Sequence, residues 1–419
     1  MAGEWRNTTV GEFAPFLYGK GLPEVRRRPG SVPVYGSNGV VGSHSEPLLS
    51  GPAVIIGRKG SVGAVHYCPE PCWPIDTTFY VVDADHARLR FKYYLLKSLG
   101  LEYMNADSAV PGLNREAAHV RIIKVPPLPE QRAIAHILGT LDDKIELNRR
   151  MSETLEEMAR ALFKSWFVDF EPVRAKMEGR DPGLPQPLAD LFPARLVESE
   201  LGEIPEGWEV ATMADHFEAA KGVSYKGAGL GGDGMPLHNL NSVYEGGGYK
   251  YEGIKYYSGE YAERHIVLPG DVIVANTEQG HDRLLIGYAA IVPALFGERG
   301  IASHHIYRLR PKPGSPLTST FLCCLLNSPE MHDLVSGYAN GTTVNMLPIE
   351  GVQKPLIVCP PRELVAAFDS LAMAAEHRRE EMVSESRTLA ALRDALLPKL
   401  IRGEIRVKDA ERFLKERGL

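Results

Sequence analysis

The chain has 419 residues, of which 44% are hydrophobic and 24% charged, and its formal net charge is −6. These values are typical of a soluble globular protein with two to four domains. No stretch approaches ~18 consecutive apolar residues, which excludes a membrane-spanning helix. The opening residues, MAGEWRNTTV, have neither the basic nor the apolar segment of a signal peptide, so we expect a cytoplasmic protein.

The cysteines are five in number, an odd and sparse set that is expected of a reduced compartment. His66, Cys68 and Cys72 are close enough in sequence to bind a metal together. No second CxxC-type pair completes a tetrahedral site, so we expect ordinary packing of these side chains and no metal site.

An internal repeat organises the chain. The segment "WRNTTVGEFAPFLYGKG" at 5–21 resembles "WEVATMADHFEAAKG" at 208–222, with Thr9 against Thr212 at an offset of 203. Later matches place Gly51 against Gly270, Asp76 against Ser303 and Val125 against Val358, at offsets of 219, 227 and 233. Since the offset only grows, the second copy reads as the first with loop insertions.

The repeat predicts an α/β fold in which each copy is a mixed α/β domain followed by a long helix. In chain order we expect a first domain at 1–128, a long helix at 129–170, a connector at 171–205, a second domain at 206–360, a second long helix at 361–401 and a charged tail at 402–419. Short β-prone runs such as "VPVYG" and "AVIIG" predict strands, and residues 91–104 have the pattern of a helix.

Both long helices carry apolar stripes that need a partner helix. Two copies related by a pseudo-two-fold axis would pair the helices as an antiparallel coiled-coil spacer. Asn148 interrupts the first stripe and either fixes the register of this pairing or lies in solvent. The packing residues that we expect in the spacer are Leu138, Leu141, Ile145, Leu155, Leu162, Leu371, Met382, Leu389 and Leu396.

The segment "PPLPEQRAIAHILGTLDDKIELNRRMSETLEEMARALFKSWFVDFEP", with the later "LGEIPEGWEV" and "PKLIRGEI", resembles the specificity subunit of type I restriction-modification systems. "VYGSNG", "GRKGSVG" and "WPIDTTFY" resemble one type of target recognition domain in that family. The resemblance implies that two such domains each read one half of a split, asymmetric double-stranded DNA site. It also implies that the helices dock two modification (methyltransferase) subunits, which restriction (translocase) subunits join.

The resemblance assigns no catalysis and no cofactor to this chain, with S-adenosylmethionine, ATP and Mg²⁺ expected in partner subunits. The residues agree, since the sequence has no Asp/Asn-Pro-Pro-Tyr/Phe motif, no GxxxxGK[ST], no HExxH and no GxSxG. Two alternatives stay open, namely a modification enzyme fused to its reader and a stand-alone DNA-binding regulator. The expected distance between half-sites is about one DNA turn, on the order of 10 bp centre to centre.

The predicted DNA contacts differ between the domains, because 1–128 carries 14 Lys and Arg against 11 Asp and Glu whereas 206–360 carries 11 against 16. The first domain can therefore bind phosphates itself, while the acidic second domain must rely on neutral groups and on partner subunits. Loops rich in Asn, Thr and Ser are also common as simple turns, and any one cation can be plain surface charge.

The candidates in the first domain are Lys20, Arg26, Arg27, Arg28, Tyr35, Ser37, Asn38, Arg58, Lys59, Ser61, Thr77 and Thr78. Those in the second domain are Lys221, Tyr225, Lys226, His238, Asn239, Asn241, Asn276, Thr277, Gln279, His281, Arg283, His304 and His305. The loops "GRKGS" and "NTEQGHDR" occupy the same position in the two copies and differ completely, as expected if each reads a different half-site.

Overall fold

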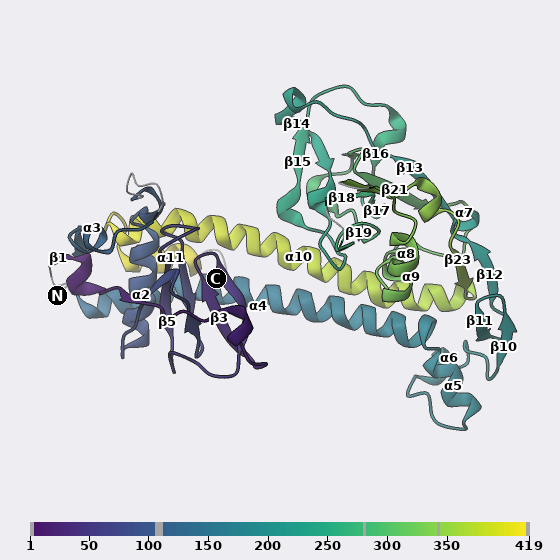
Figure 1. Ribbon diagram of the computed structural model, residues 1–419, viewed down its shortest axis with the longest axis horizontal. Coiled ribbons are helices and arrows are strands. Elements are labelled where there is room, and N and C mark those ends of the chain that lie inside the picture. The colour runs from purple at the N-terminus through teal and green to yellow at the C-terminus, as the bar shows by residue number, and fades with distance from the viewer. Residues whose placement is uncertain (1–3, 105–111, 280–281, 342–343, 416–419) are drawn as a thin grey trace. The chain divides into compact units, whose positions relative to one another are not determined.

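The computed structural model describes residues 4–104, 112–279, 282–341 and 344–415 (Figure 1). The chain divides into two compact units, unit 1 with Met1–Leu147 and Glu385–Leu419 and unit 2 with Asn148–Ser384. Each unit has a sheet-rich part and one stretch from each of two long helices, α4 (Leu128–Phe163) and α10 (Arg362–Ile401). The predicted fold class is confirmed. No helix in the described residues is long and apolar enough to cross a membrane.

The described residues of unit 1 form three small sheets, arranged as β2-β8-β5-β6, β4-β3-β7 and β1-β9. All pairs are antiparallel except β3 with β7, so the unit is mixed, as predicted. The strands are β1 (Arg6–Thr9), β2 (Leu17–Tyr18), β3 (Val32–Gly36), β4 (Gly39–His44), β5 (Ala53–Gly57), β6 (Val65–Cys68), β7 (Trp73–Pro74), β8 (Thr78–Val81) and β9 (Ile122–Val125).

The helices of unit 1 outside the long pair are α1 (Val10–Phe13), α2 (His86–Lys97), α3 (Arg115–His119) and α11 (Val407–Lys415). The prediction of a helix over 91–104 is wrong at both ends. Asp85 starts α2 early, because its carboxylate accepts the N–H of Arg88 at 3.0 Å. Gly100, with φ 64°, lies between the end of α2 and a short 3-10 turn at Leu101–Tyr103.

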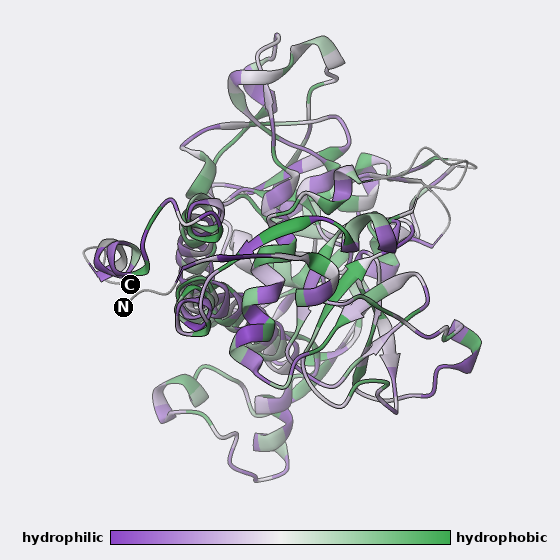
Figure 2. Cartoon of the chain, turned by 90° about the vertical axis from the view of Figure 1, so that its left-hand side faces the viewer, coloured by the Kyte–Doolittle hydropathy of each residue, from purple (hydrophilic) through white to green (hydrophobic). Residues whose placement is uncertain are grey.

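The core of unit 1 joins the sheet, α2 and both long helices. β5 is buried along its whole length, and strands of this hydrophobic kind are green in Figure 2. Leu89 and Leu96 of α2 pack into the same cluster as Leu138 of α4 and Leu396 of α10. The helical stripes are therefore held by the domain core as well as by each other.

Unit 2 repeats the plan with two four-stranded sheets, β13-β21-β17-β19 and β15-β14-β20-β16, and the pairs β12-β23, β18-β22 and β10-β11. Its strands are β10 (Leu196–Ser199), β11 (Gly202–Pro205), β12 (Glu209–Thr212), β13 (Phe217–Lys221), β14 (Leu230–His238), β15 (Lys255–Tyr257), β16 (Ile266–Val267), β17 (Val272–Ala275), β18 (Thr277–Gln279), β19 (Ala289–Ile291), β20 (Gly300–Ala302), β21 (Ile306–Pro311), β22 (Val344–Met346) and β23 (Leu356–Cys359). Its shorter helices are α5 (Glu171–Met177), α6 (Gln186–Ala189), α7 (Met213–His216), α8 (Ser319–Leu326) and α9 (Pro329–Ser336).

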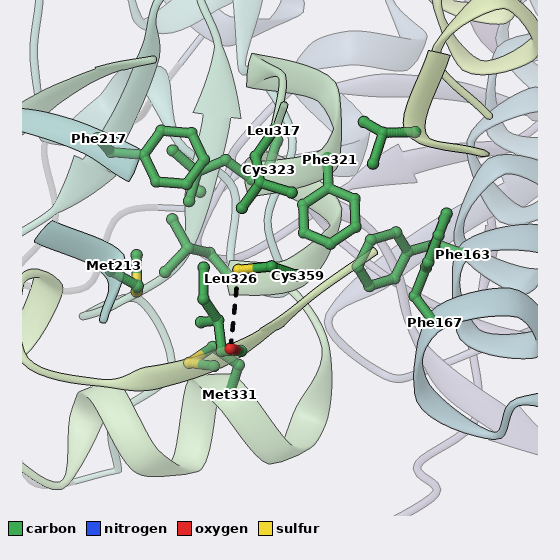
Figure 3. Packing of buried hydrophobic residues seen from close by; sticks show 14 of the residues in the cluster. Phe163, Phe167, Met213, Phe217, Leu317, Phe321, Cys323, Leu326, Met331 and Cys359 are labelled. Atoms are coloured by element: carbon green, nitrogen blue, oxygen red, sulfur yellow. Dashed lines mark hydrogen bonds between the residues drawn. The ribbon is translucent and has the colours of Figure 1, made fainter. Parts of the chain in front are cut away.

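An aromatic cluster closes the core of unit 2 where α4 ends (Figure 3). The ring of Phe163 lies 5.1 Å from that of Phe321 in α8 and 5.6 Å from that of Phe368 in α10. After Phe163 the helix widens into a π-helical turn, Lys164–Val168, whose Trp166 and Phe167 are also buried. This packing ties both long helices to the sheet-rich part of unit 2.

Strand registers support most of the repeat that the sequence predicts. β1 pairs with β9 as β12 pairs with β23, and a capping box follows each first strand, at Thr9 and at Thr212. Ile56 lies opposite Phe79, and at offsets of 219 and 227 this becomes the observed pair of Ala275 and Ile306.

The predicted offset of 233 at the start of the helices is wrong by one residue. Val125 lies opposite Arg6, while Cys359 lies opposite Glu209, so Val125 corresponds to Cys359 at an offset of 234. The helices begin at Leu128 and Arg362, with the same offset. The sequence alignment matched Val125 to Val358 because both are valines. The register is set by strand pairing and not by side-chain identity, so this match is off by one residue.

The two long helices run antiparallel within each unit. In unit 1 Asp142 pairs with Arg393 at 2.7 Å and Lys144 with Glu385 at 3.5 Å, so numbers rise along one helix and fall along the other. In unit 2 Glu156 pairs with Arg379 at 2.6 Å.

Asn148 is buried, and its Nδ2 donates to the carbonyl oxygen of Met382 at 3.4 Å. The alternative of a solvated Asn148 is therefore wrong. At the corrected offset Met382 is also the repeat equivalent of Asn148. A buried amide that bonds to the facing helix favours one register of the pair.

Most of the expected spacer residues are buried or half-buried. Leu138, Leu141, Met382, Leu389 and Leu396 are buried, whereas Ile145, Leu155 and Leu162 are half-buried. Leu371 is the error, since its side chain is 52% exposed. The buried face of α10 here runs through Phe368 and Ala372, and Leu371 lies at the edge of that face.

Candidate nucleic-acid interface

Three loops of unit 1 meet beside the end of β5, and we call the group Ser37, Asn38, Arg58, Lys59, Ser61 and Thr77 the Arg58 cluster. The backbone N–H groups of Arg58 and Lys59 donate to the Thr77 carbonyl at 2.9 and 3.1 Å. Ser37 Oγ donates to the same carbonyl oxygen at 2.7 Å, and Ser61 Oγ donates to Asn38 Oδ1 at 3.4 Å. The structure thus brings together half of the first-domain candidates.

Arg58 is held in place within this cluster. Its Nε and Nη2 donate to the Asp76 carbonyl at 3.1 and 2.8 Å, and its Cζ lies 5.5 Å from the ring centre of Tyr18. Arg115 lies over the same ring at 5.0 Å. Sequence reasoning missed Tyr18 and Arg115, because they reach Arg58 through β2–β8 pairing and through the Leu113 N–H, which donates to the Arg58 carbonyl.

The other first-domain cations lie apart from the contacts that define this cluster. Arg27 Nη1 donates to the Val41 carbonyl at 2.7 Å, and Arg28 pairs with Glu46 at 2.8 Å. Arg26 is exposed in a 3-10 turn, and Lys20 Nζ lies 5.9 Å from the ring centre of Trp73.

Two predicted base contacts of the first domain face inward. Thr78 is fully buried and donates to the Ile75 carbonyl at 2.7 Å. Tyr35 is half-buried against the small cluster of Ala53, Ile55, Cys68 and Cys72. Burial raises the pKa of the Tyr35 phenol.

The cysteines near Tyr35 pack as ordinary core residues. Cys68 and Cys72 are buried, and His66 Nε2 lies 3.2 Å from the Ser37 carbonyl oxygen. Over the described residues, no group of three His, Cys, Asp or Glu side chains has the arrangement of a metal site.

The equivalent place in unit 2, at the end of β17, holds a group without Lys, Arg, Asp or Glu that we call the His304 cluster: Tyr225, Asn276, Thr277, His304 and His305. Asn276 Nδ2 donates to the His304 carbonyl at 3.1 Å, and Thr277 Oγ1 lies 2.9 Å from His305 Nδ1. The two imidazole rings are 3.8 Å apart, and the Tyr225 ring lies 5.9 Å from that of His304.

The electrostatics of this cluster keep His305 uncharged. Burial lowers the pKa of His305, and the nearby His304 and Lys221 lower it further. A neutral imidazole can both donate and accept a hydrogen bond, as base-edge recognition requires. Asn276 Oδ1, Ser303 Oγ and His304 Nδ1 are buried and have no hydrogen-bond partner among the described residues.

Other second-domain candidates are scattered. His238 is buried with its Nδ1 2.7 Å from the Tyr249 hydroxyl, and burial lowers its pKa to about 4. Asn239 is buried and its Oδ1 accepts the Asn241 N–H at 2.9 Å, a structural cap. The exposed candidates are Lys221, Lys226, Asn241 and Arg283. His281 and the side chain of Gln279 lie outside the described residues.

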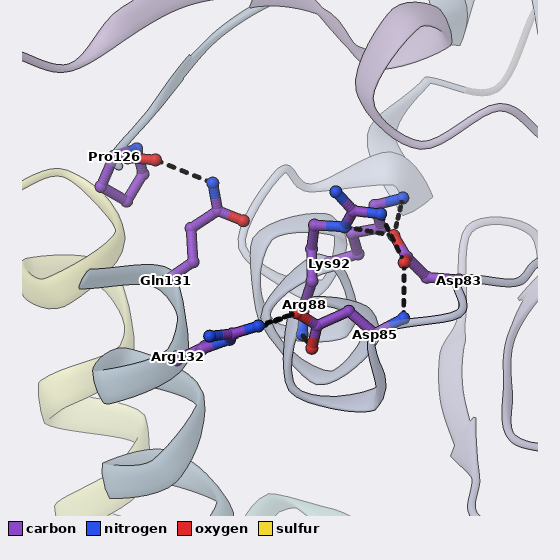
Figure 4. A network of polar contacts seen from close by, with 7 residues as sticks. All are labelled: Asp83, Asp85, Arg88, Lys92, Pro126, Gln131 and Arg132. Carbon is purple, nitrogen blue, oxygen red and sulfur yellow. Dashed lines mark hydrogen bonds and ion pairs between the residues drawn. The ribbon is translucent and has the colours of Figure 1, made fainter. Parts of the chain in front are cut away.

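A separate charged network lies in unit 1 near the start of α4 (Figure 4). The Asp83 carboxylate pairs with Arg88 at 2.7 Å and with Lys92 at 2.6 Å. Burial opposes its charge, but these partners hold the pKa of Asp83 at about 2. Arg132 of α4 pairs with Asp85 at 2.6 Å, which attaches the helix to the β8–α2 turn. Every charge here has a partner, so the network serves the fold.

The repeated domains and the paired helices agree with known proteins. Residues 2–157 match the family model described as "Type I restriction modification DNA specificity domain". The chain is 25% identical over 337 residues to the type I restriction enzyme HindI specificity subunit of Haemophilus influenzae, covering 68% of this chain and 69% of the relative. It is 25% identical over 371 residues to the MjaIX specificity subunit of Methanocaldococcus jannaschii, covering 85% and 78%.

A solved structure has the same fold. The type I restriction-modification S subunit from M. genitalium superposes with a TM-score of 0.57 at 15% identity, over 95% of this chain and 96% of that one. Residues 2–157 therefore match the type I specificity-domain family, and over most of its length the chain is similar to type I restriction-modification specificity subunits.

Proposed function

We propose that this chain reads a bipartite, asymmetric DNA site, one half with each domain, and that it docks modification and restriction subunits without catalysing a reaction itself. The observation that carries the proposal is the pair of unlike clusters at equivalent positions. Gly57 ends β5 and its repeat equivalent Asn276 directly follows β17, yet one cluster presents Arg58 and Lys59 and the other presents amide, hydroxyl and imidazole groups.

The members of these clusters that reach the surface are the proposed DNA contacts. Arg58 and Lys59 suit phosphates or guanine, whereas the half-buried imidazoles of His304 and His305 suit base edges. Thr277 is buried and would support His305 through its hydroxyl. The partner subunits would supply S-adenosylmethionine-dependent methylation of an adenine in each half-site and ATP- and Mg²⁺-dependent restriction. They would also supply part of the phosphate binding that the acidic second domain lacks.

The helical pair is the proposed spacer between the half-sites. α4 has 36 residues and is therefore about 54 Å long. Inserting four residues after Met151, with a matching insertion in α10, should change the gap in the recognised site and leave both half-sites unchanged. An unchanged gap would exclude the helices as the ruler.

The decisive experiment expresses the chain with its neighbouring modification subunit in a methylation-free host and maps modified adenines by single-molecule sequencing. We expect a split motif with a fixed gap, and the loss of modification when Arg58 and Lys59 are both replaced by Ala. A stable complex that modifies nothing would favour a stand-alone regulator. Methyl transfer by the chain alone would favour a fused enzyme.

A further inference from the structure

Tyr18 gathers two arginines at one place on the surface of unit 1. Arg115 Cζ lies 5.0 Å and Arg58 Cζ 5.5 Å from the centre of its ring, so the two guanidinium carbons are at most about 10.5 Å apart. The Tyr18 side chain is 52% exposed. A cationic pair of this kind is therefore open to a ligand from solvent.

Both guanidinium groups already have hydrogen-bond partners within the domain. Arg58 uses Nε and Nη2 on the Asp76 carbonyl, and Arg115 uses Nε and Nη2 on Glu116 Oε1 at 3.0 and 2.8 Å. Neither Nη1 has a hydrogen-bond partner among the described residues. A prearranged cation loses less conformational entropy when it binds an anion than a free side chain does.

The charge of the pair is only partly compensated. Arg115 forms an ion pair with Glu116, but Arg58 forms none with any carboxylate of the described residues, since it bonds only to a backbone carbonyl. A planar guanidinium with free N–H groups fits phosphate oxygens, and an aromatic face stabilises it further. Phosphates of one DNA strand rise 3.4 Å apart along the axis, so neighbouring phosphates fall within reach of both arginines.

We propose that Arg58 and Arg115, with the ring of Tyr18 as their shared platform, form a clamp for backbone phosphates of the first half-site. The clamp rests on the proposed function, and it adds Arg115 and Tyr18 to the residues that bind DNA. It positions the domain on the duplex, and other side chains of the Arg58 cluster read the bases.

The test measures the affinity of the complex of the full chain with its modification subunit for a duplex that carries the mapped motif, over a series of salt concentrations. Each lost phosphate contact lowers the slope of log affinity against log salt by about 0.9. We expect this loss for R115A, retention of the slope for R115K, and a loss for Y18A that Y18F does not show.

The matched control is R121A, because Arg121 is also exposed and also donates to a carbonyl, that of Leu99. Its slope should equal that of the wild type, and thermal melting of each variant checks that it is folded. An R115A slope equal to that of R121A would overturn the clamp. So would an R115A variant that prefers a different base at unchanged slope. If the wild-type complex does not prefer the motif over a scrambled duplex, the proposed function itself fails.

Discussion

The Arg58 and His304 clusters occupy the same place in the repeated domain plan and differ in chemistry. One follows β5 and presents Arg58 and Lys59, while the other follows β17 and presents amide, hydroxyl and imidazole groups, and burial lowers the pKa of His305. The strands beneath them keep the same pairing, Ile56 with Phe79 and Ala275 with Ile306. Strand pairing therefore holds the scaffold while the loop side chains vary freely, which is what two unlike half-sites require.

The largest expected effect is a loss of stability in unit 2, whose core contains the aromatic cluster. Phe368 packs on Phe163, Trp166 and Phe167 with ring distances of 5.6, 6.3 and 5.3 Å. Phe368→Ala should cost about 3–5 kcal/mol of unfolding free energy, because it leaves a cavity in the aromatic cluster. Chemical denaturation measures this cost. Leu371→Ala, three residues away and exposed, should cost less than about 0.5 kcal/mol.

The next largest effect is a pH dependence of the stability of unit 2, which contains the buried His238. Burial lowers the pKa of His238 to about 4, below its ordinary value of 6.5, so the unfolded chain takes up the proton first. The stabilisation is complete above pH 6.5 and is lost as the pH falls toward 4, by on the order of 3 kcal/mol in all. Urea unfolding at pH 7.5 and 5.0 should show a smaller pH dependence for His238→Gln.

The two clusters can be compared directly by the effect of one variant in each on recognition of the two half-sites. Arg58→Ala should weaken binding at the first half-site by about 1.5–3 kcal/mol whatever its base sequence, because it removes a prearranged phosphate contact. Thr277→Val should weaken recognition of the second by about 1 kcal/mol, because His305 Nδ1 loses its hydroxyl partner. Methylation maps of near-cognate sites measure both effects. Equal effects of one variant on both half-sites would contradict the assignment of one cluster to each.

The smallest expected effect concerns the surface charge of unit 1. Arg28 pairs with Glu46 at 2.8 Å, with both side chains more than half exposed. Arg28→Ala should change the free energy of unfolding by no more than about 0.5 kcal/mol, because water screens such pairs. A melting curve checks this. With stability unchanged, a drop in DNA affinity would report a direct contact by Arg28.

Sequence reasoning found the repeat, the fold class and the Arg58 turn, and its errors have physical causes. It grouped Arg58, Lys59 and Ser61 correctly because a glycine-rich turn keeps near neighbours together. It missed Arg115 because 57 residues separate it from Arg58, and a backbone hydrogen bond and the Tyr18 ring bring the two together. It offered Thr78, His238 and Asn239 as base contacts, but composition does not tell an exposed polar group from a buried one.

Periodicity and self-similarity alone determined that this chain folds as two α/β copies with paired helices, since apolar spacing specifies buried faces and similar segments fold alike. The helix register and the contacts between distant residues depend on the tertiary structure. It shifted the helix register to an offset of 234, buried Asn148 against Met382 and placed two arginines on one tyrosine. These outcomes depend on long-range strand pairing and on which face each side chain presents to the core, and a local pattern contains neither.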